Sequence, residues 1–289
     1  WDVAVVDIVS LPVFVLRLLH TPVMFYCHFP DKLLAEHLKK SQEKEPAGKG
    51  AGPSAFMRAY RRLVDWLEEW TMACANNVAV NSGFTRGVVR SVFPQLEKRI
   101  GRELVVLHPP VSKRAVAEGA DEKASDDDSE ITIISLNRYE RKKRVDLAIS
   151  AFAKLFDDDS PIPQHLKPHL RLKIAGGFDP RIPENVEHLA ELQTLASHLH
   201  LTVTGPAPQL EFLLNISAER RGTLMRHAAC LVYTPVGEHF GIIPLEAMAA
   251  GCPVVGMKSG GVLETVRDGV TGWLCEEQSA EDVAGALGK

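Results

Sequence analysis

A strand-to-helix junction between residues 230 and 250 constrains the fold of this chain most strongly. Residues 230–235 form a short β-rich run that ends at a proline, which predicts a strand. Residues 242–250 have helix-forming composition, and Pro244 is tolerated because the first helical turn needs no amide hydrogen there. A strand, a loop and a helix in succession are the repeating unit of doubly wound α/β sheets.

Two glutamates lie on either side of this junction. Glu238 is in the loop, and Glu246 is inside the helix, eight positions later. The first-turn N–H groups around Phe240, Gly241 and Ile242 would have no partner within the helix and could bind a phosphate. One carboxylate could then reach a sugar, and the other could reach hydroxyls beyond the phosphate. Two glutamates at this spacing also occur by chance, so the pair alone does not establish a nucleotide-sugar site.

A basic loop follows a second predicted strand. Residues 131–136 predict the strand and residues 145–156 a helix, with Arg138 at the strand end and Lys143 near the helix start. Loops at the carboxyl ends of parallel strands face the ligand crevice, where fixed cations could neutralise a diphosphate. Solvated side chains are the simpler interpretation for the other basic residues of the loop, Arg141, Lys142 and Arg144.

Composition narrows the possible functions. A chain of 289 residues is long enough for two domains. The net charge of −4 leaves no electrostatic footprint for nucleic acid. Five scattered cysteines show no paired metal spacing, so they are predicted to be reduced and to pack in the core. For a chain that stays in the cytosol, the sequon at 215–217 is interpreted as a chance occurrence.

The first half predicts a second α/β region. Residues 3–7 and 23–27 predict strands, and prolines and charges interrupt residues 8–27 too often for a membrane span. His28 follows the second strand. Residues 39–55 predict a mobile insertion because they are rich in glycine, proline, lysine and glutamate.

Residues 56–73 predict an amphipathic helix. Its apolar residues recur at helical spacing, and arginines lie elsewhere on its surface. Packing of the apolar face on the domain core is the favoured interpretation, and contact with a membrane surface is the alternative.

Residues 238–246, 251–256, 259–264 and 268–274 form a block of turns, strands and helix starts that resembles the donor-binding half of glycosyltransferase family 4. The resemblance implies the GT-B fold, an α/β fold with two Rossmann-like domains facing a cleft. The expected organisation is a partial N-terminal acceptor-side domain at 1–111, an acidic linker at 112–130 and a donor-binding domain at 131–289. The family's glycine-rich opening and its terminal crossing helix are not visible, so both ends are expected to be truncated.

Five further motifs narrow the resemblance: FYCHFPD, DWLEEWT, NRYERKK, the run IAGGFDPR–ENVEHLAEL, and YTPVGEHFGIIPLEAM. With them, the chain is similar to eukaryotic mannosyltransferases that build dolichol-linked oligosaccharide. The resemblance implies GDP-mannose as donor, a dolichyl-diphosphate oligosaccharide as acceptor, and retention of anomeric configuration. It also implies a place on the cytosolic face of the endoplasmic reticulum membrane, with other enzymes of the same pathway as possible partners. Two alternatives are an enzyme of the family that uses a UDP-sugar and a non-catalytic scaffold with the same fold.

The resemblance also suggests residue roles. Arg138 and Lys143 match the diphosphate-binding pair, and Glu246 would hold the ribose. Glu238 would hold the mannose, and His28 would line the acceptor side near the reacting sugar.

No metal or other cofactor is expected. Some glycosyltransferases hold a divalent metal with an Asp-x-Asp pair, but the aspartate triplets at 126–128 and 157–159 do not follow apolar strands. Both are interpreted as solvated runs, and donor binding is expected to be metal-independent.

Overall fold

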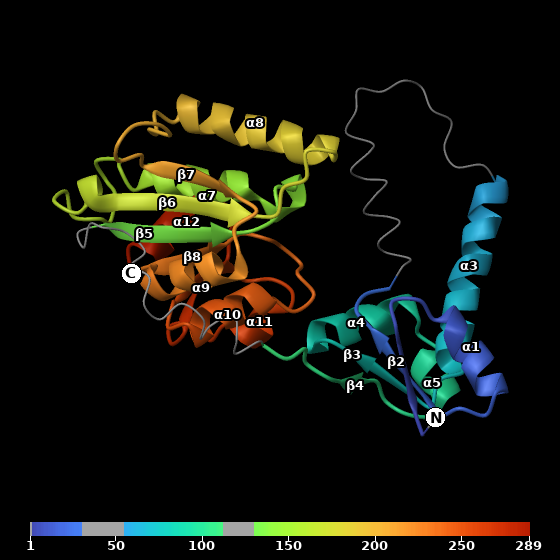
Figure 1. Cartoon of the computed structure of the whole chain (residues 1–289). Coiled ribbons are helices and arrows are strands. Elements are labelled where there is room, and N and C mark those ends of the chain that lie inside the picture. The colour runs from blue at the N-terminus through green and yellow to red at the C-terminus, as the bar shows by residue number, and fades with distance from the viewer. Residues whose placement is uncertain (1, 31–54, 112–129) are drawn as a thin grey trace. The chain divides into compact units, whose positions relative to one another are not determined.

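The computed structural model describes residues 2–30, 55–111 and 130–289, and the chain divides into two compact units, Trp1–Pro109 and Pro110–Lys289 (Figure 1). Three features predicted from the sequence lie outside the described residues. They are the aspartate triplet at 126–128, and, apart from their last residues, the insertion at 39–55 and the linker at 112–130.

The first unit contains a parallel four-stranded sheet in the order β1-β2-β3-β4. Its elements are β1 (Ala4–Asp7), α1 (Leu11–Leu18), β2 (Val23–Cys27), α3 (Ala55–Ala73), β3 (Asn77–Val80), α4 (Gly83–Val92), α5 (Leu96–Ile100) and β4 (Val105–Val106). Val13, Phe25, Val78 and Leu96 belong to its buried core. The apolar runs at 3–7 and 23–27 therefore form strands, as predicted.

Helix α3 packs differently from the sequence-based interpretation. Four apolar residues of its middle turns are each at least 40% exposed: Tyr60, Leu63, Val64 and Leu67. Packing occurs near the helix end, where the rings of Trp70 and Phe14 lie 4.9 Å apart. The favoured prediction, that the whole apolar face packs on the core, is therefore wrong for these middle turns. Among the described helices, none combines the length and apolarity needed to cross a membrane.

The second unit contains a parallel six-stranded sheet in the order β10-β9-β8-β5-β6-β7. Its strands are β5 (Ile131–Leu136), β6 (Leu170–Gly176), β7 (Leu210–Leu214), β8 (Cys230–Tyr233), β9 (Val254–Met257) and β10 (Gly272–Cys275). Its helices are η1 (Arg141–Lys143), α7 (Val145–Lys154), η2 (Lys167–His169), α8 (Pro183–His198), α9 (Ala218–His227), α10 (Ile242–Ala249), α11 (Val262–Thr265) and α12 (Ala280–Leu287).

Helices cover both faces of this sheet. One core cluster joins the sheet to α7, α8 and α12, and a second joins it to α9, α10 and α11. Strands that are buried on both faces form nearly continuous apolar runs in the sequence. The strand predicted at 131–136 therefore has the same bounds as the observed β5. The turn at 268–271 leads into β10, which runs parallel to β9.

The five cysteines are free thiols. Burial raises the pKa of Cys230, Cys252 and Cys275 to about 12, so these three are neutral apolar packing groups at physiological pH.

Replacing a central core leucine should destabilise the protein strongly. Leu172 of β6 is fully buried, so Leu172→Ala should lower the free energy of unfolding by about 2–5 kcal/mol through lost burial and a residual cavity. Leu263 is 51% exposed, so Leu263→Ala, the matched control, should change it by less than about 0.5 kcal/mol. Urea denaturation followed by circular dichroism compares the two. Equal losses would contradict the assigned core.

Candidate active site

A cavity of about 500 Å3 opens at the carboxyl ends of the strands in the second unit. From β5 the chain continues outward through β6 and β7, then returns to the other side of β5 with β8. Loops that leave adjacent strands in opposite directions create the usual ligand crevice of such sheets. The lining residues are Leu136, Asn137, Arg138, Ala175, Gly176, Gly177, Asn215, Ile216, Ala218, Arg221 and Ile243.

The helix start predicted at the 230–250 junction is present. α10 begins at Ile242, after Gly241 takes a φ of 86° that only glycine adopts easily. The preceding loop packs tightly against Gly261, where a Cβ would lie 2.3 Å from Phe240 Cα. The Gly261 N–H also donates to the Glu238 carbonyl at 2.6 Å. These contacts fix the loop that carries Glu238, and the first turn of α10 supplies Ile243 to the cavity.

Lys143 and Glu238 form an ion pair between the loops that follow β5 and β8. The Lys143 ammonium donates to Glu238 Oε1, although the two residues are 95 positions apart. The Lys143 carbonyl accepts a hydrogen bond from Thr234 Oγ1 at 2.8 Å, so the residue that follows β8 also fixes the backbone of the lysine. The site thus places one positive and one negative group side by side, able to bind a phosphate oxygen and a sugar hydroxyl respectively.

Tyr233 completes the surroundings of Glu238. Burial chiefly, together with the charge and hydrogen bonding of Glu238, raises the pKa of the Tyr233 phenol. The phenol therefore keeps its proton, and Glu238 has a neutral donor as well as an ammonium beside it.

Glu246 lies inside α10 and is only 7% exposed. Arg221 of α9 donates from Nη2 to Glu246 Oε1 at 3.2 Å. The other oxygen, Oε2, is buried and has no hydrogen-bond partner among the described residues. Because a buried carboxylate oxygen without a donor is costly, this atom is suited to accept a hydrogen bond from a ligand hydroxyl.

Arg138 lines the cavity and is well exposed. Its Nη1 donates to Glu140 Oε1 at 3.1 Å. Phe240, in contrast, is buried.

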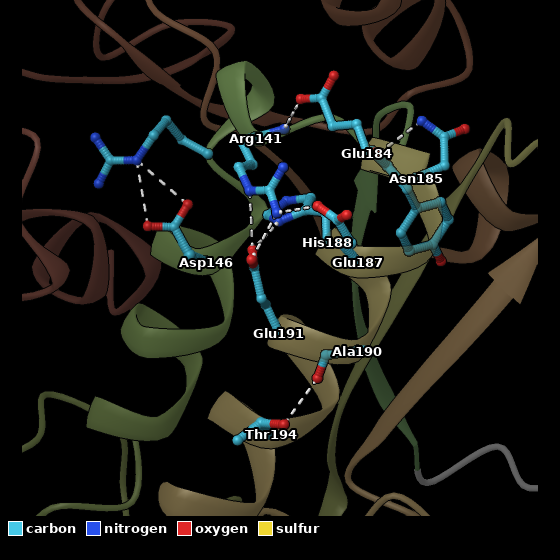
Figure 2. A network of polar contacts seen from close by, with 11 residues as sticks. Arg141, Asp146, Glu184, Asn185, Glu187, His188, Ala190, Glu191 and Thr194 are labelled. Atoms are coloured by element: carbon cyan, nitrogen blue, oxygen red, sulfur yellow. Dashed lines mark hydrogen bonds and ion pairs between the residues drawn. The ribbon is translucent and has the colours of Figure 1, made fainter. Parts of the chain in front are cut away.

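Arg141 is held by three glutamates of α8 (Figure 2). Its guanidinium donates to Glu191 at 3.1 and 2.6 Å and to Glu187 at 3.1 Å, while its backbone N–H donates to Glu184 at 3.1 Å. Spacings of three and four residues place these carboxylates on one helix face. Arg141 is therefore not the freely solvated residue suggested by the sequence, because it fastens the basic loop to α8.

Two buried residues of α8 strengthen this attachment (Figure 2). His188 Nδ1 lies 3.2 Å from Glu191 Oε2, and Asn185 Nδ2 donates to the Tyr139 carbonyl at 3.1 Å. The loop that carries Arg138 and Lys143 is thus held at both Tyr139 and Arg141 by one rigid helix.

His28 follows β2 in the first unit. Its Nε2 lies 3.7 Å from an Asp7 carboxylate oxygen, and its ring meets that of Tyr26 edge-on, with centroids 4.8 Å apart. His28 is thus exposed at the carboxyl end of its own sheet, and its predicted role stays a prediction.

The sequence interpretation missed Arg221 and Asn215. Asn215 exchanges two hydrogen bonds with the backbone of Phe178, at 2.8 and 2.7 Å, and lines the cavity. Ser217 caps α9 by accepting from the Arg220 N–H, which places Arg221 in the first turn. The Ser217 cap after a β-rich run was a signal that could have placed the first turn of α9 at the strand ends.

Within residues 2–30, 55–111 and 130–289, no three His, Cys, Asp or Glu side chains converge as metal ligands. Metal-independent donor binding stays a prediction.

Solved structures define the class of fold. The chain matches sucrose-phosphate synthase from Thermosynechococcus elongatus with a TM-score of 0.69 and 20% identity, covering 99% of this chain and 63% of that one. It matches Anabaena HepE, solved in complex with UDP and glucose, with a TM-score of 0.63 and 18% identity, covering 95% and 63%. At such identities the likeness establishes the fold alone. The expected α/β GT-B class, that of these glycosyltransferases, is confirmed.

Residues 118–289 match the family described as glycosyl transferases group 1. The chain belongs to this family, which confirms the resemblance found in the motifs. It is 36% identical to alpha-1,3/1,6-mannosyltransferase alg-2 of Neurospora crassa, over 97% of this chain and 59% of the relative. It is 37% identical to ALG2 of Mus musculus, over 96% of this chain and 61% of the relative. The chain spans about three fifths of the length of these relatives.

The contact between Arg141 and Glu191 should make stability depend on pH. The pKa of the Glu191 carboxyl lies below its usual value of 4.5, chiefly because Arg141 donates a hydrogen bond to it. A hydrogen bond from His188 lowers this pKa further. This contribution to the free energy of unfolding is present above the usual pKa of 4.5. It is lost as the pH falls through the lower pKa that Glu191 has in the folded state. Glu191→Gln should therefore flatten the acid limb of a plot of urea midpoint against pH.

Glu219→Gln, which changes an exposed glutamate of α9, is the control for this measurement and should leave the acid limb unchanged. An unaltered acid limb in Glu191→Gln would show that the Arg141 contact does not stabilise the fold.

Proposed function

We propose that the protein containing this chain is a retaining mannosyltransferase. It transfers mannose from GDP-mannose to a dolichyl-diphosphate oligosaccharide, making α-1,3 and α-1,6 linkages during assembly of the N-glycan precursor. The names of relatives that are 36–37% identical support the reaction. The observation that carries the proposal in this chain is the Lys143–Glu238 pair at the crevice between β5 and β8.

The donor would bind along this crevice. Arg138 and Lys143 would hold the diphosphate, together with backbone N–H groups of Phe240, Gly241 and Ile242 at the start of α10. A helix start and fixed cations both favour phosphate, and they supply the positive charge that a metal would otherwise contribute. Glu246 would accept hydrogen bonds from the ribose hydroxyls, a role supported by its buried Oε2.

Glu238 would hold hydroxyls of the mannose. Its position against Lys143 keeps the sugar beside the diphosphate, which favours the geometry of reaction. The bond between the anomeric carbon and the phosphate oxygen breaks while the acceptor oxygen bonds to the same face of that carbon. The acceptor proton passes to the departing phosphate oxygen, so GDP leaves and configuration is retained. Lys143 stabilises the negative charge that grows on that oxygen.

His28 would support the reacting region from the acceptor side. This role rests on the family resemblance, and the exposure of His28 beyond β2 is compatible with it.

Because the proposed acceptor is a lipid, the enzyme would act at a membrane surface. The family resemblance implies that this surface is the cytosolic face of the endoplasmic reticulum membrane. The exposed stripe of α3, formed by Tyr60, Leu63, Val64 and Leu67, supports contact with a membrane surface. Pathway enzymes are further proposed partners.

Loss of the ion pair should reduce turnover. Lys143→Ala or Glu238→Gln should lower kcat about 10²- to 10³-fold, because each removes an electrostatic group aimed at the reacting centre. Lys142→Ala is the matched control, since Lys142 is exposed one residue away, and it should retain near-normal activity. The assay follows transfer of labelled mannose from GDP-mannose to dolichyl-diphosphate oligosaccharide by the full-length protein. Near-normal kcat in Lys143→Ala would refute the assignment.

Donor binding should not require a metal. Calorimetry of this chain with GDP-mannose should give the same affinity with and without EDTA, and Glu246→Ala should weaken binding. UDP-glucose and UDP-N-acetylglucosamine serve as competitors. Preferential binding of a UDP-sugar would overturn the proposed donor, and loss of binding in EDTA would overturn the metal-independent site.

A further inference from the structure

Arg221 links two helices at the cavity. It lies in the first turn of α9, where its backbone N–H donates to the Ser217 carbonyl at 3.0 Å. Its guanidinium crosses to α10 and donates to Glu246 at 3.2 Å, while the side chain also lines the cavity. The arginine is thus anchored by its backbone at one end and by Glu246 at the other.

In the contact between Arg221 and Glu246, the two carboxylate oxygens of Glu246 differ in their hydrogen bonding. Oε1 accepts from Arg221, whereas Oε2 is buried and has no hydrogen-bond partner among the described residues. Removal of Arg221 would free the carboxylate to rotate and would leave a buried charge uncompensated. The guanidinium therefore fixes both the charge and the orientation of Glu246.

A vicinal diol has the chemistry to complete this site. Two neighbouring hydroxyls can donate to a fixed carboxylate, and hydrogen bonds to charged acceptors are stronger than those between neutral groups. Arginine suits the positioning role because its planar guanidinium remains charged and offers several donors in fixed directions. One donor of Arg221 holds Glu246, and the side chain also lines the cavity.

We propose that Arg221 is a positioning residue for ribose recognition. It holds Glu246 in the orientation that accepts the ribose diol of the nucleotide, and so makes the site selective for ribonucleotides. The inference rests on the proposed donor function, in which Glu246 contacts the ribose. It is independent of the base, because GDP and UDP carry the same diol.

The experiment measures ribose selectivity by calorimetry on this chain. Each protein is titrated with GDP and with its dideoxyribose analogue, and the ratio of the two Kd values is the readout. The wild type should favour GDP by roughly 10- to 100-fold, the range expected for hydrogen bonds to a charged group. Arg221→Gln and Glu246→Gln should each reduce the ratio to less than about threefold, and the double variant should lose no more than Glu246→Gln alone.

Arg220→Gln provides the matched control. Arg220 is the preceding residue of the same helix turn and is exposed, so its variant should keep the wild-type ratio. Thermal unfolding establishes that each variant is folded. Arg221→Lys retains a positive charge and provides a second test if Arg221→Gln does not fold. The lysine variant should show a ratio below that of the wild type because an ammonium lacks the guanidinium geometry.

The outcomes separate the two proposals. Full ribose selectivity in a folded Arg221→Gln or Arg221→Lys variant, alongside its loss in Glu246→Gln, overturns the role of Arg221 and leaves the proposed function intact. Binding of UDP but not GDP overturns the proposed donor, and the same series with UDP and its dideoxyribose analogue then tests Arg221. A folded wild type that binds neither nucleotide overturns both.

Discussion

The pairing of β5 with β8 determines where the candidate site forms. Ile133 and Ile134 lie beside Cys230 and Leu231 in parallel register, although nearly a hundred residues separate the strands in sequence. The register brings both strands to the same edge of the sheet, where their loops meet. The contact between Lys143 and Glu238 follows from this pairing.

Neighbouring elements then hold in place the loops that carry the charged side chains at this edge of the sheet. α8 holds the basic loop through Arg141 and Asn185, and a close approach at Gly261 holds the loop of Glu238. Preorganised charges are effective because they need little rearrangement when a ligand or a transition state develops charge. The glutamates of α8 thus act on the site indirectly, by restricting the loop that presents its cations.

Several elements were predictable because their signals are local. A few consecutive residues are enough to predict each of three features: the apolar run of β5, the helix-forming composition of α10 and the basic loop after Leu136. The middle turns of α3 were mispredicted because amphipathic spacing defines an apolar face without showing what covers it. Arg221 was missed for a related reason: an arginine in a helix has no distinguishing sequence until its partner on α10 is known.

The sequence by itself determined the alternation of strands and helices, the family, and the presence of Arg138, Lys143, Glu238 and Glu246 at loops and a helix near strand ends. Only the tertiary structure decided that Lys143 contacts Glu238 and that Arg221 contacts Glu246. Helical and strand periodicity encode which face of an element is apolar, but not the order of strands in a sheet. Contacts between distant loops depend on that order, so they became visible only once the sheet was assembled.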